Sequence, residues 1–277
     1  MALPVLKRSQ RGDAVFLWQN FLVGQGLLDQ ADGIFGLKTE EATKAYQRAH
    51  SLKEDGEVGN QTYGTALLEG LAAVEFELDF PPKPPFPPLV DTAARQAVFG
   101  RFDFELDSQP GNREHIRILG SWQQDHIEHI EMVSLLDLEH PIIRANSKMP
   151  FHKEAGAQLQ GLWQAWKAKD LVRLILTFDG SFVPRLIRGA PLVNNPSKLS
   201  NHAFGSAFDI NAAFNPLGHL PASISQKGSV RLLVPIANDY GFYWGGHFSG
   251  RKDGMHFEVA KILSSAELAT LTNKYNL

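Results

Sequence analysis

The chain has 277 residues, of which 43% are hydrophobic, so it can bury a substantial core, and a disordered or fibrous protein is excluded. Its 27 basic and 30 acidic residues give a formal net charge of -3. The basic residues form no block of the kind that would indicate nucleic acid or an anionic membrane as a partner. There is no cysteine, which excludes disulfides and thiolate metal sites and leaves imidazole and carboxylate as metal ligands.

A short internal repeat lies within residues 9–70. The segment DGIFGLKT at 32–39 returns as DGEVGNQT at 55–62, an offset of 55 − 32 = 23 residues. In each copy the aspartate and glycines suit a tight turn with positive φ, and the threonine can cap a following helix. Apolar residues at three- and four-residue steps, typical of helices with one apolar face, are Val15, Trp18, Leu22, Ala42, Ala45, Tyr46 and Ala49. We therefore predict a small three-helix domain over residues 1–72.

This arrangement resembles the peptidoglycan-binding domain 1 family. RGDAVFLWQNFL would form its first helix, DGIFGLKTEEATKAYQRAHSL its central loop and helix, and DGEVGNQTY its closing repeat. The resemblance implies that bacterial peptidoglycan is the partner and that cell-wall glycopeptide binds in a shallow groove near these loops. The alternative is a generic helical bundle in which the D-G turns are only turns.

A proline-rich linker is predicted over residues 73–90. Positions 81–88 hold six of the 16 prolines in the chain. Proline fixes φ and donates no backbone hydrogen bond, so this run favours a polyproline II conformation and a stiff spacer between two domains. A ligand for an SH3-like domain is the alternative interpretation.

Residues 91–150 predict little beyond a strand at 102–106 and a helix at 122–136, and we assign them no function. Their histidines are His115, His126, His129 and His140. Two of them, His126 and His129, would lie one helical turn apart and could share a metal. The acidic residues that interleave with them favour a solvated helix face instead.

The remaining pattern predicts an α+β fold. An amphipathic helix is expected at 151–169, and an apolar strand at 171–178 should deliver residues 181–185 to a site. Residues 208–211 are typical of the start of a strand. A helix is expected at 229–240, with Gly241 as its C-cap and with Pro235 as a feature that disfavours it.

The candidate chemistry lies between residues 200 and 258. Two histidines and a carboxylate from separated segments can hold one zinc ion and leave its fourth position to water, and we interpret His202, Asp209 and His256 as those ligands. Asp253 precedes His256 by three residues and is our candidate general base. No HExxH motif is present, which excludes the usual helical metalloprotease arrangement.

These residues resemble the M15 family of zinc peptidases that cut peptidoglycan peptides, whose pattern is S-x-H-x-x-G-x-A-x-D followed by a distant (E/D)-x-x-H. The matching positions are Ser200, His202, Gly205, Ala207, Asp209, Asp253 and His256. The resemblance implies a hedgehog-type zinc peptidase fold, with an antiparallel sheet and flanking helices, for a domain over 91–277 with its core at 151–260. It also implies that an upstream arginine stabilises the negative oxygen formed during the reaction. Arg185 is our match for this arginine and Arg188 is the fallback.

Other residues near the motif are candidates for supporting roles. Trp244, His247 and Ser200 are our candidate substrate contacts, and the W-G-G block is expected to shape the pocket wall. Ser200 and Asn211 could also support the ligands through hydrogen bonds.

The sequence thus predicts a zinc-dependent peptidoglycan hydrolase, an L-alanyl-D-glutamate endopeptidase by preference, with a D-alanyl-D-alanine carboxypeptidase, a zinc amidase and a non-catalytic wall-binding protein as alternatives. We expect a monomer without stable membrane association that acts in the bacterial cell wall or periplasm. No signal peptide is visible, so we expect synthesis in the cytoplasm and release either as a phage endolysin through holin-type lysis or as a bacterial effector through a dedicated secretion system.

Overall fold

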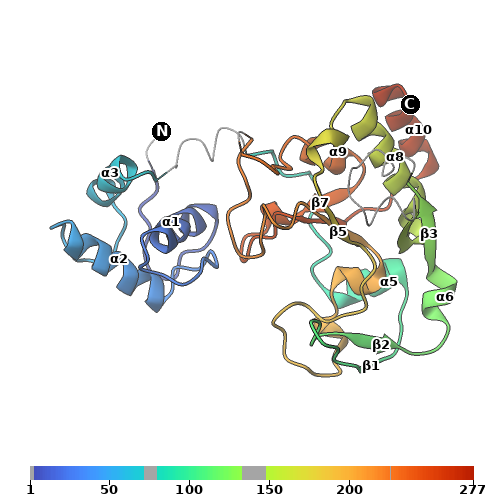
Figure 1. Ribbon diagram of the computed structural model, residues 1–277, viewed down its shortest axis with the longest axis horizontal. Coiled ribbons are helices and arrows are strands. Elements are labelled where there is room, and N and C mark those ends of the chain that lie inside the picture. Colours follow the sequence, from blue (N-terminus) through green and yellow to red (C-terminus); the bar gives the residue numbers. More distant parts are fainter. Residues whose placement is uncertain (1–2, 72–79, 133–147, 225) are drawn as a thin grey trace. The chain divides into compact units, whose positions relative to one another are not determined.

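The computed structural model describes residues 3–71, 80–132, 148–224 and 226–277. Helices and small antiparallel sheets alternate along the chain, so the protein is α+β as predicted (Figure 1). The chain divides into two compact units, each built from segments that are distant in sequence. The first unit comprises Met1–Pro81, Ala213–Arg231 and Gly245–Met255, and the second comprises Pro82–Ala212, Leu232–Trp244 and His256–Leu277.

The N-terminal part of the first unit contains helices α1 (Asp13–Gly24), α2 (Leu37–Ala49) and α3 (Asn60–Leu68). Their apolar faces enclose one core around the fully buried Trp18. The rings that surround this indole are Phe21, Tyr46 and Tyr63. Edge-on and stacked aromatic contacts of this kind add to the stabilisation that comes from burial alone.

A buried glutamine on α1 closes the first copy of the repeat. The side-chain oxygen of Gln19 accepts hydrogen bonds from the backbone N–H groups of Asp32 (3.0 Å) and Gly33 (2.7 Å). Its amide nitrogen donates to the Asp32 carboxylate, the Ile34 carbonyl and the Thr39 hydroxyl. This single side chain therefore hydrogen-bonds to five polar groups of the loop and of the first turn of α2.

Gln47 on α2 closes the second copy in the same way. It accepts from the N–H of Gly56 at 2.9 Å and donates to the Asp55 carboxylate, the Glu57 carbonyl and the Thr62 hydroxyl. The repeat in sequence is thus a repeat of one hydrogen-bonding arrangement.

The predicted turn conformation is confirmed, whereas the predicted threonine cap is wrong. Gly33 and Gly56 have φ of 73° and 74°, the left-handed region that glycine adopts without strain. The N-caps of α2 and α3 are glycines 36 and 59, so the threonines lie one turn inside each helix. Their hydroxyls accept hydrogen bonds from Gln19 and Gln47 and do not cap the helix N-termini.

Loops 213–231 and 245–255 complete the first unit, together with the start of the proline-rich run. The ring nitrogen Nε2 of His247 donates to the carbonyl of Pro81 at 2.8 Å, and the Phe80 ring lies 5.0 Å from the Arg231 guanidinium. Lys252 is fully buried and pairs with Asp13 of α1. Residues 73–79 of the predicted linker lie outside the described part of the chain.

A four-stranded antiparallel sheet organises the second unit, with strand order β5-β6-β8-β7. Its strands are β5 (Phe178–Gly180), β6 (Ala207–Ile210), β7 (Phe242–Trp244) and β8 (His256–Val259). Alternation of side chains turns Phe208 and Phe257 to one face, where their rings stack at 5.3 Å and meet Trp166 of helix α8 (Gly156–Ala168). The opposite face is therefore left for polar chemistry.

Further elements of the second unit precede and follow the sheet. They are helices α5 (Thr92–Phe99), α6 (Trp122–His126), α9 (Val234–Asp239) and α10 (Ser265–Tyr275), and strands β1 (Phe104–Leu106), β2 (Ile116–Ile118), β3 (Ile127–Glu131) and β4 (Lys148–His152). Strands β1 and β2 form one antiparallel pair and β3 and β4 form another. Within the part of the chain that the structure describes, the short 3-10 helices are η2 (Lys153–Ala155), η3 (Val172–Leu174), η4 (Pro196–Lys198), η5 (Asn201–Phe204) and η6 (Gly245–His247).

The predicted helix at 122–136 is wrong beyond its first turn. α6 ends at His126, and His129 lies in strand β3, so the two histidines are not one helical turn apart. Pairing with β4, a partner distant in sequence, overrides the local helical pattern. Residues 133–136 of that predicted helix and His140 lie outside the described residues.

The predicted strand at 171–178 is also wrong over most of its length. Its apolar residues form a 3-10 turn in which Val172 and Ile175 are buried, and strand β5 begins only at Phe178. An apolar run does not distinguish a buried turn from a buried strand.

The helix within 151–169 is confirmed, and the strand start predicted at 208–211 is confirmed up to Ile210. The helix expected at 229–240 is confirmed in part, since α9 covers only Val234–Asp239. Pro235 lies in the first turn of α9, where a backbone N–H would have no partner within the helix, so proline is tolerated there. The C-cap is Tyr240 rather than the predicted Gly241, which follows it with φ 76°. Among the described residues, none of the helices combines the length and the apolar character that a bilayer span requires.

Candidate metal centre

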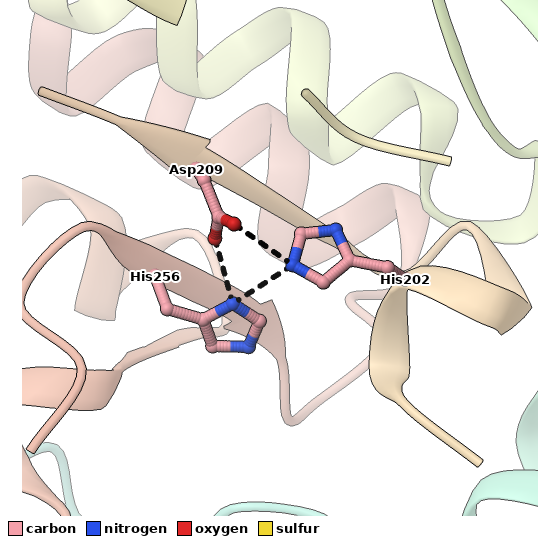
Figure 2. A group of neighbouring side chains, drawn as sticks. All are labelled: His202, Asp209 and His256. Carbon is pink, nitrogen blue, oxygen red and sulfur yellow. Dashed lines mark hydrogen bonds and ion pairs between the residues drawn. The ribbon is translucent and has the colours of Figure 1, made fainter. Parts of the chain in front are cut away.

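Strand register brings two predicted ligands side by side. Asp209 on β6 and His256 on β8 are directly opposite each other in the antiparallel pair. Cross-strand partners have β-carbons about 4.5–5.5 Å apart, so both side chains project together from the polar face of the sheet. Figure 2 shows both side chains converging with that of His202.

His202 comes from the short helix η5 that leads into β6. The Ser200 hydroxyl accepts from the His202 N–H and begins this helix, and Gly205 ends it in the left-handed conformation with φ 62°. A β-carbon on Gly205 would lie 2.6 Å from the Ile127 side chain and 3.1 Å from the His152 nitrogen, so glycine is required there for space as well as for φ. The serine and the glycine of the motif therefore act by placing the histidine.

Three ligand atoms face one another at the centre. Nε2 of His202 lies 3.2 Å from an Asp209 carboxylate oxygen and 3.2 Å from Nδ1 of His256, which is 2.9 Å from the other Asp209 oxygen (Figure 2). One atom from each residue lies within 4.8 Å of the others, and among the described residues this is the only such group of three or more. Two imidazoles and a carboxylate are the donor set of a catalytic zinc site.

The outer nitrogen of His202 fixes which of its ring nitrogens can bind a metal. Nδ1 lies 2.6 Å from the backbone carbonyl of Ser181. A carbonyl only accepts, so Nδ1 carries the proton and Nε2 presents its lone pair to the centre. Ser181, the first residue of the segment 181–185, therefore contacts His202 through its carbonyl, although it follows a shorter strand than expected.

The centre favours a charged carboxylate. Burial alone would raise the pKa of Asp209, but the adjacent His202 and His256 outweigh this effect and hold its pKa well below the usual range. An ionised carboxylate between two imidazoles matches the chemistry that a divalent cation needs.

Asp253 occupies the loop of the first unit that ends just before β8. Its backbone N–H donates to the carbonyl of Gly245 at 3.1 Å. A β-carbon on Gly245 would lie 2.4 Å from the Asp253 carbonyl oxygen and 2.9 Å from its β-carbon. The first glycine of the W-G-G block thus permits the close approach of the Asp253 backbone. The role of Asp253 as general base stays a prediction.

The two candidate arginines have different surroundings. Arg188 donates to the carboxylate of Glu114 at 3.0 Å, and Glu114 is buried. The Arg185 carbonyl accepts from the N–H of Ser200 at 3.1 Å, so the backbone of Arg185 runs beside the segment that carries His202. The role of Arg185 in the reaction stays a prediction.

The candidate substrate contacts are all buried. Trp244 is 0% exposed, His247 is 1% exposed and Ser200 is 6% exposed, so their contact with substrate also stays a prediction. Asn211 supports the chain at 174–177, since its side-chain oxygen accepts from the N–H groups of Leu176 and Thr177.

Sequence reasoning assigned no role to Glu258 or Arg95, which contribute to the centre, and none to Ser181 beyond its place in the segment expected to reach a site. The Glu258 carboxylate lies 3.2 Å from Nε2 of His256. Its signal in the sequence is the H-x-E spacing of β8, because alternate residues of a strand share a face. Arg95 and Ser181 carry no local signal.

Two comparisons with protein families agree with this geometry. Residues 194–259, which contain all three ligands and Asp253, match the M15 peptidase model described as D-alanyl-D-alanine carboxypeptidase. Residues 11–65, which contain both copies of the repeat, match the model described as putative peptidoglycan binding domain. A search of curated proteins found no match to the chain. The two matches support a peptidase of the M15 type over residues 194–259 and a peptidoglycan-binding module over residues 11–65.

Proposed function

We propose that this chain is a zinc-dependent hydrolase that cleaves amide bonds in the stem peptides of peptidoglycan. The observation that carries the proposal is the convergence of one ligand atom each from His202, Asp209 and His256. The family match over residues 194–259 supports peptidase chemistry, and the match over residues 11–65 supports peptidoglycan as the polymer.

The chain's own residues would divide the reaction between them. A bound zinc ion would lower the pKa of a water ligand toward neutrality and polarise a carbonyl. As water attacks the carbonyl carbon, Asp253 takes a proton from it and later gives that proton to the departing amine nitrogen. The Arg185 guanidinium donates to the carbonyl oxygen while negative charge develops on it. No covalent intermediate with the chain is required.

The bond that we propose is the one between L-alanine and D-glutamate. The support is the sequence pattern, in which an aspartate takes the place of the base and a W-G-G block precedes it, as in the L-alanyl-D-glutamate endopeptidase branch of the family. A D-alanyl-D-alanine carboxypeptidase is the second candidate, and the match of residues 194–259 to the family model of that description favours it.

Mass spectrometry of digested peptidoglycan separates these candidates. An endopeptidase creates new N-terminal D-glutamate, whereas a carboxypeptidase removes a terminal D-alanine. Free N-acetylmuramyl glycans with intact stem peptides would identify an amidase, and the absence of any product would leave a non-catalytic wall-binding protein.

Two variants test the site assignment. We expect His256→Ala to lose both zinc and activity, and Asp253→Ala to keep zinc and lose activity. Removal of zinc with a chelator should abolish hydrolysis, and added zinc should restore it. Wall lysis that persists in both variants would refute the enzymatic proposal.

The N-terminal module would act by tethering. A module bound to an insoluble polymer raises the local concentration of its substrate, so even a weak peptidase can be effective. Action on the cell wall suits a phage endolysin as well as an exported bacterial effector. Substitution of exposed residues in the repeat loops at 32–39 and 55–62 should lower the rate on intact walls far more than the rate on soluble muropeptides.

A further inference from the structure

The second metal-ligating histidine has a buried carboxylate behind it. Glu258 lies two residues after His256 in β8, on the same face of the sheet, and is 3% exposed. Its oxygen Oε2 is 3.2 Å from Nε2 of His256, while Nδ1 of that ring faces the other two ligands. Glu258 therefore contacts the His256 ring on the side away from the other two ligands.

Glu258 is in turn held by a residue of the motif. The side-chain nitrogen Nδ2 of Asn201 bonds to the same oxygen of Glu258. The side-chain oxygen of Asn201 accepts from the Arg95 guanidinium at 2.9 Å. Arg95 is 5% exposed and also donates to the carbonyl of Leu199 at 3.1 Å.

The donor and acceptor roles along this chain of bonds are fixed by chemistry. A guanidinium only donates, so the asparagine oxygen faces Arg95 and the asparagine nitrogen faces Glu258. An ionised carboxylate only accepts, so the contact with His256 requires a proton on Nε2. A neutral ring with a proton on Nε2 has its lone pair on Nδ1, the atom that faces the centre.

Because Arg95 and Glu258 are buried, the loss of one hydrogen-bond partner would leave the other charge without compensation. A buried carboxylate is costly unless it is paired and hydrogen-bonded. Burial lowers the pKa of Arg95, and the charge of Glu258 opposes that shift, so each ion stabilises the other. Helix α5 holds Arg95 in place, since Asp91 caps it through the N–H of Ala94 and Thr92 donates to the carbonyl of Pro196.

We propose that Arg95, Asn201 and Glu258 form a relay that holds His256 in the tautomer with its proton on Nε2, and thereby sets the zinc affinity of the site. The proposal rests on the proposed function, because it presumes that the three ligands bind zinc. The three relay members are positioning residues, and none of them contacts substrate. The relay gives a function to helix α5, in the region for which the sequence predicted none.

The test uses the intact chain and measures zinc binding by competition with a chromogenic chelator. Glu258→Gln keeps the volume and an acceptor oxygen but removes the charge, and we expect the zinc dissociation constant to rise about 10- to 100-fold. Glu114→Gln is the matched control. It removes another buried carboxylate that pairs with an arginine, and we expect a change within about threefold.

A spectroscopic measurement on the unaltered protein keeps the proposal testable if a variant fails to fold. In zinc-loaded protein, ¹⁵N NMR of the imidazoles should show a proton on Nε2 of His256 and metal on Nδ1. Metal on Nε2 instead, or equal zinc affinity for wild type and Glu258→Gln, would overturn the relay and leave the proposed function standing. An unaltered chain that binds no zinc would overturn the proposed function itself.

Discussion

Replacing Gly245 with alanine tests how strictly catalysis depends on the position of Asp253. The added β-carbon would lie 2.4 Å from the Asp253 carbonyl oxygen, whereas ordinary contact begins at 3.4 Å, so the Asp253 backbone must move by about the difference of 1 Å. Misplacement of a reacting group by about 1 Å can lower a rate about 100-fold. This loss corresponds to about 2.7 kcal/mol in the activation free energy.

The assay is the release of new amino groups from purified peptidoglycan, measured together with zinc affinity. We expect kcat to fall about 100-fold in Gly245→Ala, while the zinc dissociation constant stays within about threefold because the three ligand side chains are unchanged. Gly250→Ala is the matched control, since it lies in the same loop and its β-carbon would meet nothing within 4 Å. Its kcat should stay within about twofold of wild type.

A double variant shows whether Gly245 acts through Asp253. In an Asp253→Ala background the alanine at 245 should cause little further loss, because residues that act as one unit are not additive. Wild-type kcat in Gly245→Ala, or an equal loss in Gly250→Ala, would refute the reasoning.

Three further predictions concern other parts of the chain. Gln47→Leu should destabilise the N-terminal module by about 2 kcal/mol or more, because it leaves buried loop groups without hydrogen bonds, and amide exchange in α2 should accelerate. Burial lowers the pKa of His152 from 6.5 to about 4, so its contribution to stability is complete above pH 6.5 and is lost as the pH falls toward 4. Unfolding free energies should fall by up to about 3 kcal/mol over this range, and a His152→Gln variant should lack that part of the slope. Arg185→Gln should lower kcat about 100- to 1,000-fold with unchanged zinc affinity. Arg188→Gln should instead lower the unfolding temperature, because buried Glu114 would lose the nearer of its two arginines. A loss of kcat equal to that of Arg185→Gln would contradict the assignment.

The three candidate ligands predicted from the sequence converge in the structure, and two of them belong together in the sequence as well. His202 and Asp209 belong to one short turn-and-strand segment, and the glycine between them marks the turn. Their convergence in the second unit with His256, a residue from a distant segment, could be predicted only from the donor set and the resemblance.

What the sequence does not predict depends on contacts between distant segments. Arg95 reaches Asn201 across 106 residues, and no local pattern marks that pair. The strand at 127–131 likewise exists because β4 pairs with it. Gln19 lies 13 residues before Asp32, and Gln47 lies 8 residues before Asp55. The repeat in the loops is therefore visible in the sequence, whereas the glutamine that each loop bonds to is not.

The direct opposition of Asp209 and His256 has a consequence for folding as well as for chemistry. A slip of one residue between β6 and β8 would bring Phe257 across from Asp209 and rotate the histidine toward the aromatic layer. A divalent ion that needs both side chains can then be captured only by the correctly aligned sheet, and by mass action it enriches that alignment. Metal binding would thus favour the register of β6 and β8 that forms the centre.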